Sequence, residues 1–133
     1  MRELKFRAVS QDSNKFVFGN LVDDGMKDKS YYILPPNADN YDEIIGVISN
    51  TIGQYTGLKD RNWKEIYEGD ILSYKEAYPD DEEQPFYVYW IDSMACFGIM
   101  YKSWDKETYV RFDRFYYTHG TVIGNIHENP EPP

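Results

Sequence analysis

The sequence predicts a mainly β protein, either a curved antiparallel sheet or a small SH3-like barrel, with one or two short helical segments. Three observations favour this fold class. Tyr, Phe and Trp make up 17% of the 133 residues, and aromatic side chains fit a pleated, half-buried surface. Several segments alternate apolar and polar residues, which is the period of a strand with one solvated face. Glycines lie at the corners of predicted strands and inside them, where a bend lets a small sheet curl.

The length is that of one ordinary domain, so we expect a single domain over residues 1–133 with a Pro-rich tail from about residue 129. In the first third, residues 3–9 and 15–22 alternate in polarity around a polar turn and predict a hairpin. Residues 31–34 form a short apolar strand that ends at two prolines. One helical turn is expected near residues 41–45, and residues 44–49 fit either a strand or the end of that turn.

The middle of the chain predicts two strands joined by a turn. Residues 51–56 form the first strand, residues 57–64 the turn, and residues 65–74 a second strand that Gly69 interrupts. A polar, acidic loop then separates these strands from the rest of the chain.

Two aromatic runs give the strongest hairpin signal. Residues 86–91 (FYVYWI) and 95–101 (ACFGIMY) flank a short polar turn. Both faces of these strands are apolar, so we expect the pair to lie centrally in its sheet. Residues 103–118 fit neither period, and residues 121–127 predict a last strand with a bulge or bend at Gly124.

The net charge of −9 limits the classes of partner. Residues 76–92 alone contribute six carboxylates and no Lys or Arg. An acidic surface repels phosphate, so we expect neither direct nucleic-acid binding nor a membrane partner. The acidic run fits a solvated loop, and the alternative is a docking surface for a basic partner.

Cysteine usage and hydropathy indicate the compartment. Cys96 is the only cysteine, which excludes a disulfide within the chain. The sequence contains no apolar run of about 20 residues and no apolar signal-peptide core at its start. We therefore expect a cytoplasmic protein.

Three separated segments carry a family resemblance. They are KFRA at residues 5–8, GQYTGLKD followed by KEIYEGDIL within residues 52–72, and VIGNIHENP at residues 122–130. Together they resemble the YopX-like proteins of bacteriophages and prophages. The resemblance implies a small, mostly β, barrel-like fold, an oligomer, and a bacterial host cell as the setting. It supplies no catalytic residues.

The sequence departs from the family pattern at two positions. Val9 stands where the family usually has Trp, and Trp63 follows Asn62 where the family usually has Gly. Asn-Gly favours a tight turn with positive φ, and Trp does not. We therefore predict a wider turn over residues 60–64, with Trp63 exposed at its tip.

Polar and aromatic side chains gather around this turn. We predict a recognition loop on a rigid hairpin, because binding residues are often carried by loops on a rigid scaffold. The alternative is that Tyr55 packs in the core and that the rest is turn chemistry. The predicted binding residues are Gln54, Tyr55, Lys59, Asp60 and Trp63.

No catalytic constellation is found. Glu65, Glu68 and Asp70 are the best acid cluster, but a hard cation needs several more converging oxygens. His119 and His127 lack a partner nucleophile in the sequence. We expect no enzyme activity, no metal site and no cofactor.

Tyrosines exceed the needs of a core of this size, and such rings are enriched at subunit interfaces. We therefore expect a homo-oligomer with a further protein partner of unknown identity. The predicted function is a phage- or prophage-encoded, non-catalytic binding or assembly module. The alternatives are an acidic, nucleic-acid-mimicking inhibitor of a basic host or phage protein, and a metal-dependent hydrolase that uses clustered acids.

Overall fold

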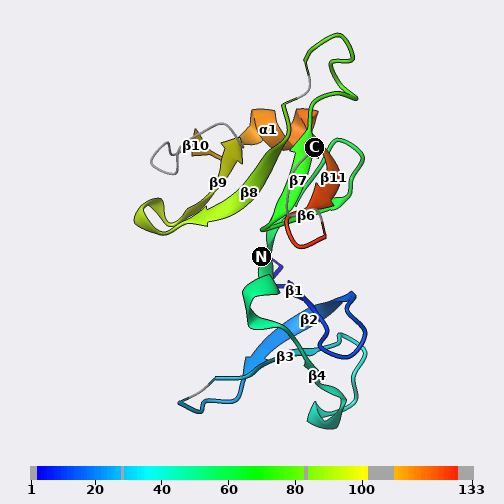
Figure 1. The fold of residues 1–133 in the computed structure, drawn as a ribbon, viewed down its shortest axis with the longest axis vertical. Coiled ribbons are helices and arrows are strands. Elements are labelled where there is room, and N and C mark those ends of the chain that lie inside the picture. Colours follow the sequence, from blue (N-terminus) through cyan, green and yellow to red (C-terminus); the bar gives the residue numbers. More distant parts are fainter. Residues whose placement is uncertain (1–2, 28, 83, 102–109, 129–133) are drawn as a thin grey trace. The chain divides into compact units, whose positions relative to one another are not determined.

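The computed structural model describes residues 3–27, 29–82, 84–101 and 110–128 (Figure 1). The described residues are mainly β, as predicted, and they divide into two compact units, Met1–Tyr55 and Thr56–Pro133. The expectation of one domain over residues 1–133 stays a prediction. The elements in chain order are β1 (Phe6–Val9), β2 (Phe16–Asp23), β3 (Tyr31–Leu34), η1 (Tyr41–Glu43), β4 (Ile45–Gly46), η2 (Ser49–Thr51), β5 (Gly53–Lys59), β6 (Glu65–Tyr67), β7 (Asp70–Ser73), β8 (Phe86–Ile91), η3 (Asp92–Met94), β9 (Cys96–Tyr101), β10 (Val110–Arg111), α1 (Arg114–His119) and β11 (Thr121–Asn125).

In the first unit, β4, β3, β2 and β1 lie side by side in that order, and β1 also pairs with the start of β5. The hairpin predicted over residues 3–9 and 15–22 is confirmed as β1 and β2, with Phe6 opposite Gly19 and Val9 opposite Phe16. Its core consists of Ala8, Ile33 and Val47. Alternation along β1 and β3 places Ala8 and Ile33 on one face, where Val47, directly after β4, packs with them.

The segment between β3 and β5 combines the two forms left open by the sequence. Residues Tyr41–Glu43 form the 3₁₀ turn η1, whose cap Asn40 accepts a hydrogen bond from the Asp42 amide at 2.8 Å. The chain then adds the two-residue strand β4 against β3. A short polar side chain before the turn is the usual start signal for such a segment.

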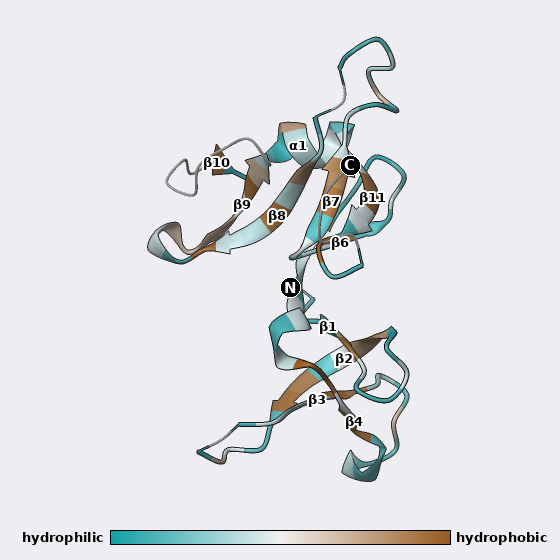
Figure 2. Cartoon of the chain, in the orientation of Figure 1, coloured by the Kyte–Doolittle hydropathy of each residue, from teal (hydrophilic) through white to brown (hydrophobic). Residues whose placement is uncertain are grey.

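In the second unit, β10, β9, β8, β7 and β11 form an antiparallel sheet in that order. The aromatic hairpin is confirmed as β8 and β9, and both strands lie inside the sheet rather than at its edge. Its buried face carries Leu72, Phe86, Val88 and Ile99 from three neighbouring strands. Figure 2 shows the apolar stretches of these strands in brown and the loop after β7 mostly in teal.

Helix α1 forms within the segment that fitted neither period. Asp113 caps its start by accepting a hydrogen bond from the Phe115 amide at 3.1 Å. Tyr116 of this helix meets the ring of Phe86 edge-on, with centroids 5.6 Å apart. Tyr74 packs against the same Phe86 ring at 5.1 Å. Aromatic packing across the core therefore fixes a helix too short to show a period in the sequence.

The strand around Gly57 differs from its predicted bounds. The strand predicted over residues 51–56 begins at Gly53 and runs to Lys59, so the expected turn over residues 57–64 is shorter. Gly57 adopts a positive φ of 84° inside the strand, and the Thr56 hydroxyl donates to the Ile66 carbonyl at 2.7 Å. A glycine can take this conformation without ending the strand pairing. The prediction that the turn begins at Gly57 is therefore wrong.

Two other glycine predictions are confirmed. Gly69, with φ of 93°, separates β6 from β7. The register of β11 against β7 shifts between Val122 and Gly124, which is the predicted irregularity. Within the described residues the sheets stay open, so the curved antiparallel form holds and the closed SH3-like barrel does not.

Phe86 is expected to be the residue on which the second unit depends most. It is 1% exposed and contacts the rings of Tyr74, directly after β7, of Tyr101 in β9 and of Tyr116 in α1. The substitution Phe86→Ala should lower the free energy of unfolding by about 3–5 kcal/mol, because it leaves a cavity and removes these contacts. Urea titration followed by circular dichroism measures this. Ile123→Ala, at a residue 44% exposed in the same unit, should change stability by no more than about 0.5 kcal/mol; equal losses for both would contradict the assignment.

Candidate functional site

The turn between β5 and β6 is a closed three-residue loop. The Asp60 amide donates to the Lys64 carbonyl at 2.8 Å, and the Trp63 amide donates to the Asp60 carbonyl at 3.0 Å. Trp63 takes a left-handed conformation with φ of 65°. This is the three-residue hairpin geometry whose third position favours glycine. The prediction of a wider turn is therefore wrong, because Trp63 itself adopts the positive φ that the tight turn requires.

The side chain of Asp60 holds this turn together from inside. Asp60 is 6% exposed. Its Oδ1 accepts hydrogen bonds from the amides of Asn62 at 2.8 Å and Lys64 at 2.9 Å. Its Oδ2 accepts from the Val122 amide of β11 at 2.9 Å. Three donors to one buried carboxylate make strong, charge-assisted bonds, so Asp60 positions the loop and ties it to the neighbouring sheet.

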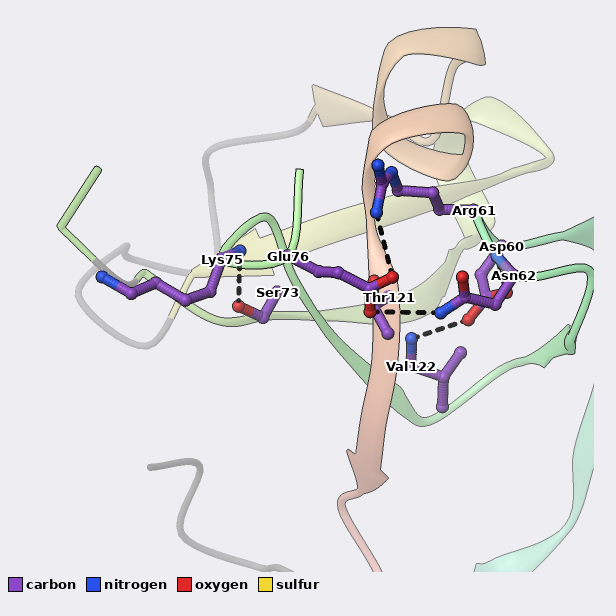
Figure 3. A network of polar contacts seen from close by, with 8 residues as sticks. All are labelled: Asp60, Arg61, Asn62, Ser73, Lys75, Glu76, Thr121 and Val122. Carbon is purple, nitrogen blue, oxygen red and sulfur yellow. Dashed lines mark hydrogen bonds and ion pairs between the residues drawn. The ribbon is translucent and has the colours of Figure 1, made fainter. Parts of the chain in front are cut away.

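Glu76, from the loop after β7, fixes the turn from its outer side (Figure 3). Its carboxylate accepts from Arg61 Nη1 at 2.9 Å, from Asn62 Nδ2 at 3.1 Å and from Thr121 Oγ1 at 3.3 Å. The Arg61 amide also donates to the Gly120 carbonyl at 3.0 Å. An exposed ion pair alone contributes only about 0–1 kcal/mol. Here the network matters because it restricts where the tip of the turn points.

Trp63 stands at this tip and is 80% exposed, as predicted. An L-residue in the left-handed region costs about 1–2 kcal/mol relative to the right-handed one. Almost none of that cost is recovered by burying the indole group. A strained residue that contributes little packing is a reason to suspect a function, since such conformations gather at binding sites.

Lysines stand at both ends of the same turn. Lys59 and Lys64 are exposed, and neither takes part in an ion pair with any other residue that the structure describes. Arg61 is paired with Glu76 and Asp60 is buried. The two lysines therefore leave a local positive charge next to Trp63, in a chain whose net charge is −9.

The remaining predicted binding residues lie in the first unit. Tyr55 is 4% exposed, and its amide donates to the Lys5 carbonyl at 2.8 Å. The Lys5 ammonium lies 5.4 Å from the centre of the Tyr55 ring. Gln54 is half-buried in β5, opposite Phe6 of β1. The structure thus brings Lys59, Asp60 and Trp63 together on one turn, and it places Tyr55 in a packed position.

Some residues of the turn were not identified from the sequence. Asn62 is an ordinary turn residue, and only its contact with Glu76 gives it a specific role. Glu76 is 14 residues away in the chain and was read as part of a solvated acidic loop. No local pattern predicts a contact of that separation. The spacing of Asp60 and Asn62 is typical of a turn and is the one signal that points to the loop.

The acids weighed for catalysis have structural contacts. Asp70 is 1% exposed, and its Oδ2 accepts from the Tyr67 amide at 2.8 Å. Glu65 Oε1 accepts from the Tyr67 hydroxyl at 3.3 Å. Among the described residues no three or more His, Cys, Asp or Glu side chains gather as they would around a metal ion.

His119 belongs to an aromatic stack. Its ring lies 4.6 Å from the ring of Phe115 and 5.7 Å from that of Tyr78. Nδ1 lies 2.9 Å from the Phe115 carbonyl oxygen, which accepts a hydrogen bond in the tautomer that carries the proton on Nδ1. His119 is therefore held by contacts at the end of α1 that explain its position without a reaction.

The fold and this turn define a small, mainly β protein with a rigid, aromatic-tipped loop. The family model for the YopX protein matches residues 5–132, so the chain belongs to the YopX family. The crystal structure of protein EF1440 from Enterococcus faecalis is similar, with 26% sequence identity, a TM-score of 0.52, and coverage of 98% of both chains. No match to a curated protein was found. Helices in the described part of the chain are too short and too polar to cross a bilayer.

Asp60 is expected to be essential to the turn. Asp60→Ala removes the acceptor of three backbone amides and should lower the free energy of unfolding by about 2–4 kcal/mol, because buried donors left unsatisfied cost about 1–3 kcal/mol each. Urea titration measures the loss. The matched variant Lys59→Ala, at the exposed neighbouring position, should stay within about 0.5 kcal/mol of wild type. A loss below 1 kcal/mol for the Asp60 variant would show that the carboxylate does not hold the loop.

The strain at Trp63 has a measurable consequence. Trp63→Gly should raise the free energy of unfolding by about 1 kcal/mol, since glycine takes a positive φ without penalty. Trp63→Ala should leave stability nearly unchanged, because alanine keeps the strain and the indole group is exposed. Thermal and urea unfolding of the two variants give the comparison. If glycine is no more stable than alanine, the left-handed conformation is not strained.

Proposed function

We propose that this chain is a non-catalytic binding or assembly module whose contact element is the turn of residues 59–64. The observation that supports this most is Trp63, a strained and 80% exposed aromatic side chain on a loop held by Asp60 and Glu76. Local backbone strain without a packing benefit is expected where the side chain meets another molecule.

The physical basis of recognition is preorganisation. Trp is among the residues that most often dominate the binding energy of an interface. A turn whose backbone is already held in its bound conformation loses less conformational entropy on association than a mobile loop. The hydrogen bonds of Asp60 and the contacts of Glu76 supply that fixation here. Only the indole group and the two flanking lysines would then need to adapt to the partner.

The setting is part of the same proposal. Membership of the YopX family supports a phage or prophage gene product that acts in the cytoplasm of a bacterial host. Exposed aromatic side chains support self-association as well, because such rings are enriched at interfaces. Those of the second unit beyond Trp63 include Tyr78, Trp90 and Phe115.

The two alternative functions receive less support. An acidic decoy needs free carboxylates arranged on one surface, yet Glu76 is bound by Arg61 and Asn62. A metal-dependent hydrolase needs converging acids, yet Asp70 is buried and accepts a backbone hydrogen bond. The binding module remains the function that the site supports best.

The proposal predicts that capture of a partner depends on Trp63. Immobilised wild-type chain and Trp63→Ala chain are incubated with lysate of infected host cells, and bound proteins are quantified by mass spectrometry. At least one specific partner should be reduced about tenfold or more by the substitution, as expected for an aromatic anchor worth at least 1.4 kcal/mol.

The matched control is Tyr41→Ala, at another exposed aromatic side chain, 70% exposed, in the first unit. It should capture the same partners as wild type. Equal capture by all three chains would remove the turn as the contact element.

A further inference from the structure

The second unit carries an open cavity of about 310 Å³ beside the loop that follows β7. Tyr74 and Tyr101 form its aromatic wall, and the loop supplies polar side chains around it. A cavity of this size lies at the lower end of those that accept a small organic group, which run from about 300 to 1,000 Å³. The lining residues are Tyr74, Lys75, Asp81, Glu82, Gln84 and Tyr101.

We propose that this cavity receives Trp63 of a second copy of the chain. The inference rests on the proposed function, because it uses the same turn as the contact element and names what that turn binds. Both the turn and the cavity belong to the second unit, so each copy carries one of each.

The aromatic wall suits an indole group. Tyr74 is half-buried, and burial, together with the neighbouring Tyr101, raises the pKa of its hydroxyl above the ordinary value. Tyr74 and Tyr101 both line the cavity, and their rings offer an aromatic surface against which an indole can pack edge-on or offset. The indole N–H also needs an acceptor when buried, and the Gln84 side-chain carbonyl and the carboxylates of Asp81 and Glu82 line the cavity.

The charges of the turn and the cavity are complementary. Lys59 and Lys64 flank Trp63 without an ion pair among the described residues. Asp81 and Glu82 line the cavity with two carboxylates. Lys75 also lines it, but its ammonium donates to the Asp81 carbonyl at 3.0 Å and is thereby held to the loop. The turn thus brings two positive charges to a cavity with a net charge of −1, which favours one orientation of docking.

A second copy is needed because Trp63 does not fill the cavity of its own chain. Its indole is 80% exposed, and the turn is held by Asp60 and Glu76. A convex, fixed tip inserts into a concave partner, as aromatic anchors do at protein interfaces. A turn that meets a different surface on the partner closes either as a two-fold pair, in which each copy inserts its turn into the other's cavity, or as a heterologous contact that leads to larger rings or open chains.

The rival occupant is single-stranded nucleic acid, whose bases stack on exposed aromatic rings between positive side chains. The net charge of −9 disfavours nucleic acid as the occupant, because an acidic protein repels a polyanion. A carboxylate-lined cavity in another protein copy meets no such repulsion at the point of contact.

The inference is tested by sedimentation velocity of the full chain, from micromolar to millimolar concentration. Wild type should show a sedimentation coefficient that rises with concentration. Trp63→Ala, which removes the tip, and the double variant Asp81→Lys/Glu82→Lys, which reverses the charge of the cavity, should each weaken self-association about tenfold or more. Tyr41→Ala should behave as wild type.

Mixing the two defective variants gives the decisive measurement. The Trp63→Ala chain keeps an intact cavity and the double variant keeps an intact tip, so their mixture should form a heterodimer that neither forms alone. Circular dichroism confirms that each variant is folded. A wild type that remains monomeric throughout, variants that associate like wild type, or a mixture with no heterodimer would each overturn the inference.

The outcomes separate this inference from the proposed function. If lysate capture depends on Trp63 but self-association does not, the turn binds a different partner and only the self-contact fails. A labelled oligothymidylate, titrated against wild type and Trp63→Ala, tests the rival directly. Binding that is lost in the variant would assign the turn to nucleic acid and overturn the self-contact.

Discussion

The buried carboxylate of Asp60 is the interaction on which the candidate site depends. It accepts three backbone hydrogen bonds, two within its own turn and one from β11. The same interaction therefore closes the loop and attaches it to the neighbouring sheet. The Arg61–Glu76 pair is half-exposed by comparison, so salt and solvent weaken it. The buried, fully hydrogen-bonded carboxylate of Asp60 therefore fixes the turn. The exposed contacts of Glu76 only restrict the direction in which the tip of the turn points.

This arrangement explains how a tryptophan can occupy a position that favours glycine. The chain around Trp63 is determined by the Asp60 hydrogen bonds on one side and by β-pairing on the other. Since these bonds do not involve the indole group, they compensate for the unfavourable φ whichever side chain is present. Position 63 can therefore carry a tryptophan in place of a glycine without loss of the turn. The energetic consequence is a small loss of stability, which a marginally stable domain tolerates when it is offset elsewhere.

The features that sequence reasoning predicted are the ones with a local cause. Two aromatic runs around a short polar turn gave β8 and β9, and Gly69 separated β6 from β7, because both signals act over a few residues. Helix α1 was not identified, since its six residues are too few for a helical period and its stability comes from packing of Tyr116 on Phe86.

The candidate site was predicted in part for the same reason. Exposure of Trp63 at a turn follows from the local sequence, whereas its φ depends on Asp60, and the orientation of the tip depends on Glu76 and Val122. Tyr55 shows what the local sequence cannot predict, because it was expected near the recognition loop and is 4% exposed in the structure. It lies four residues before Lys59, and no local pattern distinguishes a tyrosine that faces the core from one beside a recognition loop.

A contact between the turn of one copy and the cavity of another places a geometric condition on assembly. The two surfaces are different, so an open chain of copies keeps one free turn at one end and one free cavity at the other until a ring closes. Whether a ring forms depends on the angle between the tip and the cavity on one copy, and not on the strength of the contact. The hydrogen bonds of Asp60 and Glu76 matter here because a flexible turn would allow many angles between copies and therefore many assemblies. Under the proposed self-contact, a rigid turn would restrict the assembly to one rotation per copy, and this would give a physical reason for a backbone conformation at Trp63 that lowers stability.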